Sequence, residues 1–119
     1  MKWIVSVLLA MAPAFATAAP SDLDSGNDYY SLYQTWKSED SSKIEKQIAK
    51  SMLYAHTKAI INAYTDMGTF CPPDGATYGQ SIDIIIEYLK KKPATRNEDI
   101  SFISLKALHS TFSCKDKTS

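Results

Sequence analysis

The sequence lacks an excess of charge of either sign, and beyond its N-terminal segment it lacks a long hydrophobic run. Its 119 residues carry 13 basic and 13 acidic side chains, so the formal net charge is zero. A nucleic-acid-binding domain needs a basic surface, which this composition does not favour. No later segment approaches the roughly 20 apolar residues of a membrane-spanning helix. These absences indicate one small domain that neither binds nucleic acid nor spans a membrane.

Catalytic motifs are also absent. The chain has no His-x-His, His-x-x-x-His or Cys-x-x-Cys pair, no glycine-rich phosphate loop and no Gly-x-Ser-x-Gly sequence. We interpret its two histidines, His56 and His109, as ordinary helix residues, because two isolated histidines rarely form a zinc site. Asp83 and Glu87 stand one helical turn apart, and we interpret them as a solvated or interface face rather than an acid–base pair. The sequence predicts a protein that is not an enzyme and uses no cofactor or metal.

The N-terminus has the organisation of an export signal. Lys2 supplies a positive start, residues 3–11 are apolar apart from Ser6, and residues 16–18 are Ala-Thr-Ala. A cut after Ala19 would place Pro20 directly behind the scissile bond, so we predict cleavage after Ala18. The predicted organisation is a signal peptide over residues 1–18 and a single helical domain over residues 19–119, exported to the periplasm.

A first helix is predicted to start at Gly26-Asn27-Asp28. It carries three aromatic residues at positions i, i+4 and i+7, which places them on one helical face: Tyr29, Tyr33 and Trp36. One interpretation, which we favour, is that this face packs on the next helix. The other is a binding surface, since tyrosine and tryptophan are enriched where proteins contribute most to binding.

A long helix of about 25 residues is predicted to follow. The capping box Ser42-x-x-Glu45 starts it, and Gly68 ends it before two prolines. Apolar residues recur at spacings of four and three, which predicts that they face the core. This predicted stripe is Ile44, Ile48, Met52, Ala55, Ala59, Ala63 and Met67, widened by Leu53, Ile60 and Tyr64.

Two further helices complete an all-α prediction. A second capping box, Thr77-x-x-Gln80, starts a helix that ends before Pro93. Asn97 is predicted to cap the last helix, because Glu98 and Asp99 would lie in its first turn. The predicted inward faces are Tyr78, Ile82, Ile85 and Leu89 on the first of these helices, and Ile100, Ile103, Ala107, Leu108 and Phe112 on the second.

The only two cysteines, Cys71 and Cys114, fit an exported protein with one disulfide. The bond would close a loop of 44 residues, for which chain entropy predicts about 4 kcal/mol of stabilisation. It would join the end of the long helix to the end of the last one. A cysteine nucleophile served by a histidine is the less favoured alternative. The predicted fold is a small four-helix domain with one long helix and a disulfide-stapled C-terminal helical hairpin.

The second half of the chain also carries an ordered set of short motifs. They are Phe70-Cys71-Pro72-Pro73, Thr77 followed by Gly79-Gln80, Tyr88-Leu89 before Pro93, and a closing Phe112-x-Cys114. This set resembles the Rap/Tai family of immunity proteins from bacterial type VI secretion systems, over 45 residues.

The resemblance implies a small, helical, periplasmic protein without catalytic activity. Its relatives protect the cell from peptidoglycan-cleaving amidases injected by neighbours, by binding the cognate amidase effector and blocking its active-site cleft. Many act as homodimers. A rigid helical element would lose little entropy on docking into such a cleft.

The candidate partner-binding residues come from two segments. One is the polar turn and helix start held close to Cys71, and the other is the aromatic face of the first helix. The candidates are Asp74, Thr77, Tyr78, Gln80, Tyr29, Tyr33 and Trp36. Two alternatives stay open, an HdeA-like periplasmic acid-stress chaperone, which would prevent client aggregation at low pH, and an inhibitor of an envelope enzyme of the host.

Overall fold

A computed structural model describes residues 23–114, so the predicted signal peptide and its cleavage point lie outside the described residues. Over this range the chain is all-α as predicted, without a strand; the extended backbone pairs only in an isolated bridge between Ser25 and Asp99. The elements are α1 (Gly26–Lys37), α2 (Lys43–Asp66), α3 (Tyr78–Lys91), the 3-10 helix η2 (Pro93–Thr95) and α4 (Ile100–Thr111). None of these helices is long and apolar enough to cross a membrane.

Reciprocal capping boxes start the first three helices. The predicted boxes of α2 and α3 are present, and α1 has one between Ser25 and Asp28 that the sequence analysis missed. The predicted cap of α4 is wrong. Asp99 caps this helix by accepting a hydrogen bond from the Ser101 backbone N–H at 2.8 Å. Asn97 is displaced from the cap because η2 and the turn after it occupy the chain up to Glu98.

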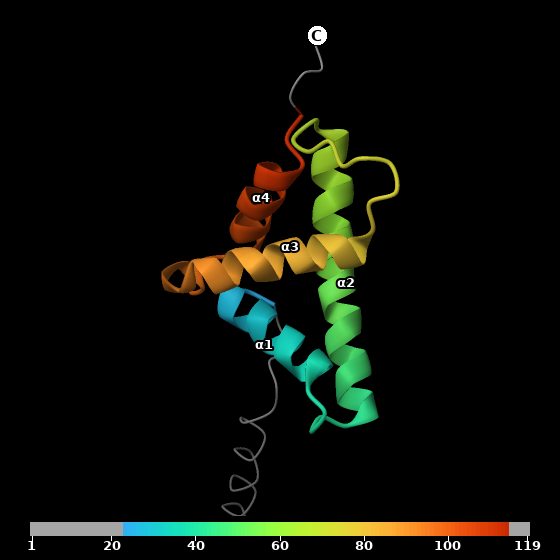
Figure 1. Cartoon of the computed structure of the whole chain (residues 1–119), viewed down its shortest axis with the longest axis vertical. Helices are drawn as coiled ribbons and strands as arrows, with labels where there is room; N and C mark the ends of the chain where they lie inside the picture. Colours follow the sequence, from blue (N-terminus) through green and yellow to red (C-terminus); the bar gives the residue numbers. More distant parts are fainter. Residues whose placement is uncertain (1–22, 115–119) are drawn as a thin grey trace, which may run out of the picture.

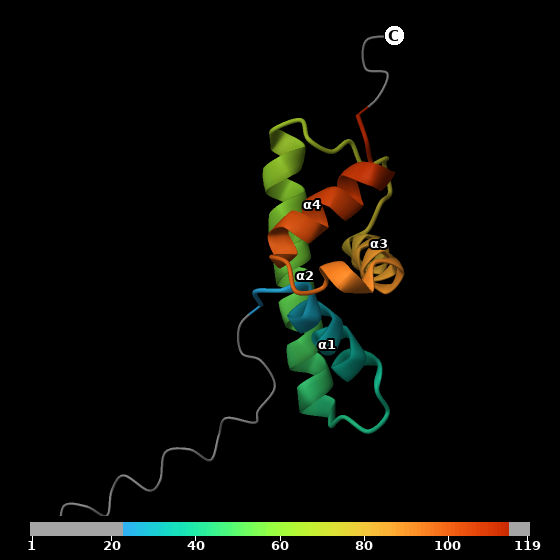
Figure 2. The same cartoon turned by 90° about the vertical axis from the view of Figure 1, so that its left-hand side faces the viewer.

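The longest helix, α2, sets the long axis of the fold, and α3 crosses it near the middle (Figure 1). Helix α1 packs against the first half of α2, and α4 lies beside its second half (Figure 2). The core fills the space between α2 and the three shorter helices. Its buried apolar residues are Tyr29, Leu32, Ala49, Leu53, Ile60, Ile61, Phe70, Ile82, Ile85, Ile86, Leu89, Ile100, Ile103, Ala107, Leu108 and Phe112. The predicted face of α4 is therefore confirmed, and that of α3 is confirmed except for Tyr78, which is only partly buried.

The predicted core stripe of α2 is largely wrong. Ile44, Ile48 and Met67 are 68, 55 and 71% exposed. The alanines of the stripe, Ala55, Ala59 and Ala63, are exposed as well. The prediction is confirmed for Leu53 and Ile60, which are buried, whereas Tyr64 is only partly buried. The complete row that faces the other helices is Ala49, Leu53, Thr57, Ile60 and Ile61. A polar residue sits at the centre of this row because the Thr57 hydroxyl has a buried hydrogen-bond partner, the Tyr29 hydroxyl at 2.9 Å.

The disulfide between Cys71 and Cys114 is present as predicted, with the two Cα atoms 4.9 Å apart. A backbone hydrogen bond supports it, since the Cys71 N–H donates to the Phe112 carbonyl at 2.7 Å. The bond joins the loop after α2 to the end of α4, with α3 enclosed between them. The orientation of α3 on α2 is thereby constrained from both of its ends.

The start of α1 closes the other side of the fold. The Gly26 and Asn27 N–H groups donate to the Glu98 and Arg96 carbonyls at 3.0 and 2.7 Å. A Cβ atom on Gly26 would lie 2.8 Å from the Ile103 side chain and 2.9 Å from the Arg96 carbonyl oxygen. Only glycine allows this approach, so the first turn of α1 is fixed against the junction of α3 and α4.

Candidate partner-binding surface

The described residues hold no group of three or more histidine, cysteine or acidic side chains that could bind a metal ion. His56 is half-buried, and its Nε2 atom lies 3.1 Å from the Ser104 hydroxyl. Burial lowers the pKa of His56, and the charge of Asp99 opposes this shift. Both cysteines are in the disulfide, which leaves no thiolate for the nucleophile alternative.

Tyr29 belongs to the core and not to a surface. Its side chain is 0% exposed, and its ring meets the His56 ring edge-on with the centroids 5.7 Å apart. Burial raises the pKa of Tyr29 well above its ordinary value. The favoured interpretation, packing on the long helix, is correct for this residue, and its proposed role as a partner contact is corrected.

Tyr33 and Trp36 are only partly buried and form an aromatic surface together with Tyr54 of α2. The Trp36 ring meets Tyr33 at 6.0 Å and Tyr54 at 6.1 Å between centroids, both edge-on. Such arrangements are favourable for aromatic rings. The three rings hold one another in place across α1 and α2, so the surface is ordered before any partner arrives.

Two lysines lie over the aromatic surface. The Lys37 ammonium is 4.0 Å from the centroid of the Trp36 ring, and the Lys50 ammonium is 5.7 Å from that of Tyr54. Within residues 23–114 the salt bridge formed is that of Lys106 and Glu98, so neither lysine over these rings is paired with a carboxylate. The surface therefore combines aromatic area with positive charge.

The polar turn before α3 lies beside this surface. Thr77 and Gln80 are exposed, but their side chains are used in the capping box, at 2.9 and 3.0 Å. Tyr78 donates its hydroxyl hydrogen to the Asn62 side chain at 3.2 Å, while Asp74 is exposed at the tip. A Cβ atom on Gly79 would lie 3.1 Å from the Tyr54 hydroxyl.

Tyr54 thus connects the two segments predicted from the sequence. It contacts Trp36 on one side and approaches the start of α3 at Gly79 on the other. Tyr54 was not among the predicted contact residues, because its neighbours are on other helices. The sequence did contain one local indication of this residue, because Lys50 and Tyr54 stand one helical turn apart on α2 and so share a face of the helix.

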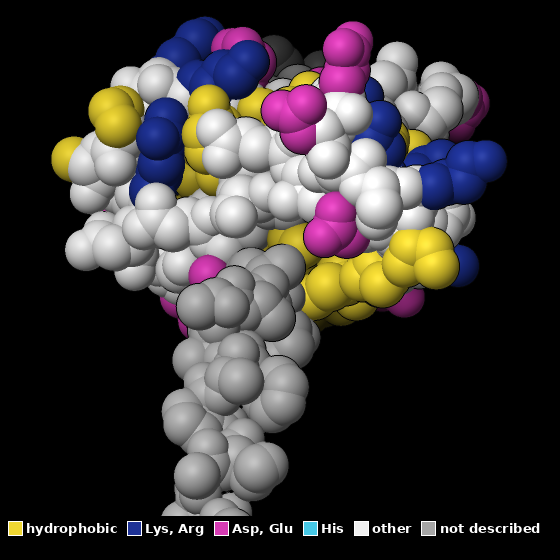
Figure 3. All heavy atoms as spheres, turned by 90° about the horizontal axis from the view of Figure 1, so that it is seen from below, with side chains coloured by type: hydrophobic (Ala, Val, Ile, Leu, Met, Phe, Trp, Pro, Cys, Tyr) yellow, Lys and Arg dark blue, Asp and Glu magenta, His cyan; other side chains and the backbone are white. Residues whose placement is uncertain are grey.

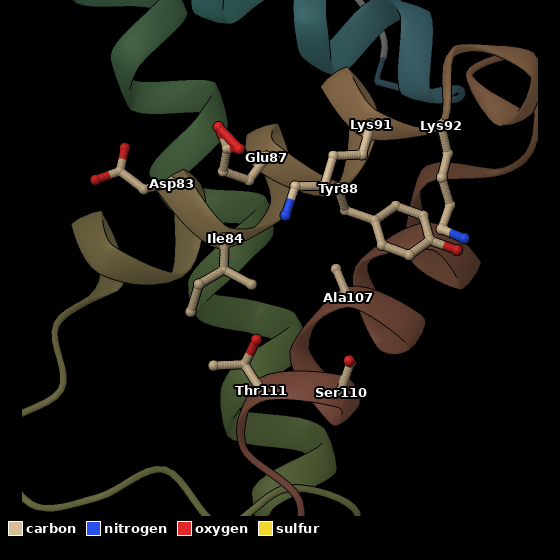
Figure 4. Close-up of a pocket in the computed structure, with 9 residues that line it drawn as sticks. All are labelled: Asp83, Ile84, Glu87, Tyr88, Lys91, Lys92, Ala107, Ser110 and Thr111. Atoms are coloured by element: carbon tan, nitrogen blue, oxygen red, sulfur yellow. The ribbon is translucent and has the colours of Figure 1, made fainter.

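A hollow of about 490 Å³ lies between α3 and α4 (Figure 4). Ile84 and Tyr88 point into the space between the two helices (Figure 4). Both carboxylates of the predicted acidic face of α3 line it, and two adjacent lysines follow about one helical turn after Glu87. Its lining is Asp83, Ile84, Glu87, Tyr88, Lys91, Lys92, Ala107, Ser110 and Thr111.

A comparison with known protein families assigns the chain to a family. The sequence model that describes Rap1a immunity proteins matches residues 25–114. The chain belongs to the Rap1a immunity protein family. The match runs from the cap of α1 to the second cysteine of the disulfide, so it includes all four helices. No curated protein and no solved structure matches the chain.

Because the chain belongs to the Rap1a immunity protein family, the partner expected at such a surface is a cognate effector protein. Of the seven predicted contact residues, Tyr33 and Trp36 lie together on the aromatic surface. Asp74, Thr77, Tyr78 and Gln80 lie on the neighbouring turn and helix start, and Tyr29 is in the core.

Proposed function

We propose that this Rap1a-family protein is a periplasmic immunity protein that blocks a peptidoglycan amidase effector of a type VI secretion system. The observation that carries the proposal is the family match over residues 25–114. The signal-like sequence before residue 19 supports a periplasmic location. The resemblance of residues 70–114 to the Rap/Tai motifs supports an amidase as the effector.

The proposed mechanism is steric occlusion without chemistry by the immunity protein itself. The protein offers a rigid surface, since the disulfide, three capping boxes and a cluster of edge-on aromatic rings fix the contact elements in advance. Pre-organisation reduces the conformational entropy lost on binding. A protein that covers the effector's cleft excludes the bulky peptidoglycan substrate with no need for catalytic residues.

The test is a stoichiometric titration. The chain without its predicted signal peptide is added to the purified cognate amidase effector, and the release of peptidoglycan cleavage products is followed. We expect activity to fall linearly and to vanish near an equimolar ratio. Hydrolysis that continues at a tenfold excess of the immunity protein would contradict the proposal, and a heat-unfolded sample is the control.

We also propose a homodimer, as the resemblance implies for many relatives. Ile44 and Ile48 are largely exposed on α2, beside the partly buried Met52. Hydrophobic side chains gather along one edge of the molecule in the view from below (Figure 3). A second copy that covers the strip of Ile44, Ile48 and Met52 would remove this apolar area from water. Light scattering measures the molar mass of the wild type and of Ile48→Glu in solution. The proposal predicts the mass of a dimer for the wild type and of a monomer for the variant.

A further inference from the structure

The two lysines of the aromatic surface are used differently from Arg96 and Lys106. Arg96 makes its contacts within the fold. Its Nε–H donates to the Leu89 carbonyl at 2.9 Å, and its guanidinium lies 4.3 Å from the Tyr30 ring centroid. Lys106 is paired with Glu98 at 3.4 Å. Lys37 and Lys50, in contrast, lie over the rings of the aromatic surface and have no carboxylate within salt-bridge distance among residues 23–114.

This arrangement suits a partner that carries negative charge. Tryptophan and tyrosine supply the large contact areas that dominate protein–protein affinity. An ammonium group held over a ring is already positioned, so an arriving carboxylate pairs with it while the neighbouring rings are covered. The edge-on contacts of Trp36 with Tyr33 and Tyr54 keep the three rings in place.

The other two surfaces differ from the aromatic surface in their charge. The hollow between α3 and α4 places the carboxylates of Asp83 and Glu87 beside the ammonium groups of Lys91 and Lys92, so it has no single sign of charge. The apolar strip of α2 begins with Ile44 and Ile48, which are uncharged. The hollow also places a lysine over a partly buried ring, with Lys92 5.6 Å from the Tyr88 ring centroid, but two carboxylates line the same space. The aromatic surface joins three rings in mutual contact to Lys37 and Lys50, and neither lysine is paired with a carboxylate among residues 23–114.

We infer that the effector docks on this surface through an acidic segment, whose aspartate or glutamate side chains pair with Lys37 and Lys50 while its backbone covers Trp36. The inference rests on the proposed function, since the partner is the effector itself. It names the contact surface and the chemistry of the segment that binds there.

The first test measures effector affinity after charge reversal. Lys37→Glu/Lys50→Glu is compared with Lys91→Glu/Lys92→Glu, which makes the same change in net charge at the hollow between α3 and α4. We expect the first variant to raise Kd about 100-fold and to reduce its salt dependence, and the second to change Kd less than about threefold. Equal effects of the two variants, or wild-type affinity of the first, would overturn the inference.

The second test measures whether the environment of Trp36 changes when the effector binds. The sequence has two tryptophans, Trp3 and Trp36, so Trp36 is the sole tryptophan after cleavage at the predicted site. In the exported chain labelled with 5-fluorotryptophan, we expect the fluorine resonance, assigned by its loss in Trp36→Phe, to shift on addition of effector. An unshifted resonance in a saturated complex would place the contact elsewhere and overturn the inference.

Truncation of the Trp36 side chain separates its contribution to effector affinity from its contribution to folding. Trp36→Ala is expected to raise Kd about 30-fold or more, while the circular dichroism spectrum stays that of a helical protein. Tyr33→Ala serves as the second variant if Trp36→Ala fails to fold. Loss of self-association in Lys37→Glu/Lys50→Glu, with effector affinity unchanged, would assign the surface to a second copy and contradict the inference.

The outcomes distinguish this inference from the proposed function. If the wild type inhibits the amidase and the charge-reversal variant inhibits it equally well, only the contact surface is wrong. If the wild type neither binds nor inhibits the amidase, the proposed function is wrong, and the inference fails with it.

Discussion

The buried residues of α1 lie between Gly26 and Leu32, whereas every residue of the helix after Leu32 is partly or fully exposed. Gly26 and Tyr29 contact other helices closely, and both are fully enclosed. Tyr33, Trp36 and Lys37 continue the same helix, but their side chains are partly or fully exposed. One 12-residue helix thus has a structural half and a half that is available for binding. Aromatic residues at helical spacing do not reveal which half is which, because burial depends on the helices that cover each turn.

Substitution at Gly26 should give the largest effect on stability. A methyl group there would lie within 2.8 to 2.9 Å of Ile103, Leu89 and the Arg96 carbonyl oxygen. The two side chains can rotate, but the carbonyl belongs to the backbone and also accepts the Asn27 N–H. We expect Gly26→Ala to lower the free energy of unfolding by about 2 to 3 kcal/mol, measured by urea denaturation.

The matched control for Gly26→Ala is Gln34→Ala, in the second half of the same helix. Gln34 is exposed, so its truncation should change stability by less than about 0.5 kcal/mol. Equal stabilities of the two variants would show that the first turn of α1 is not held more tightly than the last.

A pair of hydroxyl deletions should give the next largest difference. Tyr29→Phe keeps the ring but removes the partner of the buried Thr57 hydroxyl, and we expect a loss of about 1 to 2 kcal/mol. Tyr33→Phe, at the surface half, should cost less than about 0.5 kcal/mol. Thermal unfolding followed by circular dichroism measures both. A larger loss in Tyr33→Phe would reverse the assignment of the two halves.

The positions of the helices were predictable because their caps are local. Ser42 with Glu45, and Thr77 with Gln80, each lie three residues apart, and a capping box depends on nothing further away. The last cap was misplaced by two residues because η2, which no local motif signalled, occupies the preceding chain.

The buried face of α2 and the composition of the aromatic surface were not predictable in the same way. Thr57 is acceptable in the core only because Tyr29, 28 residues away, bonds to it. Tyr54 joins the surface only because Trp36 and Gly79 are brought beside it by folding. Such residues are determined by contacts between helices, which periodicity within one helix does not report.

The smallest expected effect is a pH dependence of stability at His56, which contacts the structural half of α1 through the Tyr29 ring. Burial lowers the pKa of His56 in the folded protein, so between the folded pKa and the ordinary value of about 6.5 the unfolded chain binds more protons. The free energy of unfolding is therefore highest above pH 6.5 and falls as the pH is lowered from there towards the folded pKa.

His56→Gln should flatten this slope, whereas the exposed His109 can be replaced by glutamine with the slope retained. The measurement is urea denaturation at intervals from pH 8 to pH 5. His56 is hydrogen-bonded to Ser104 and lies against the Tyr29 ring, and both of these residues are buried in the core rather than on the aromatic surface. Protonation at this position should therefore weaken the structural half of α1 while the effector affinity of the folded protein changes little. A parallel fall of affinity and stability in the wild type, absent from His56→Gln, would show that the two halves of the helix are coupled.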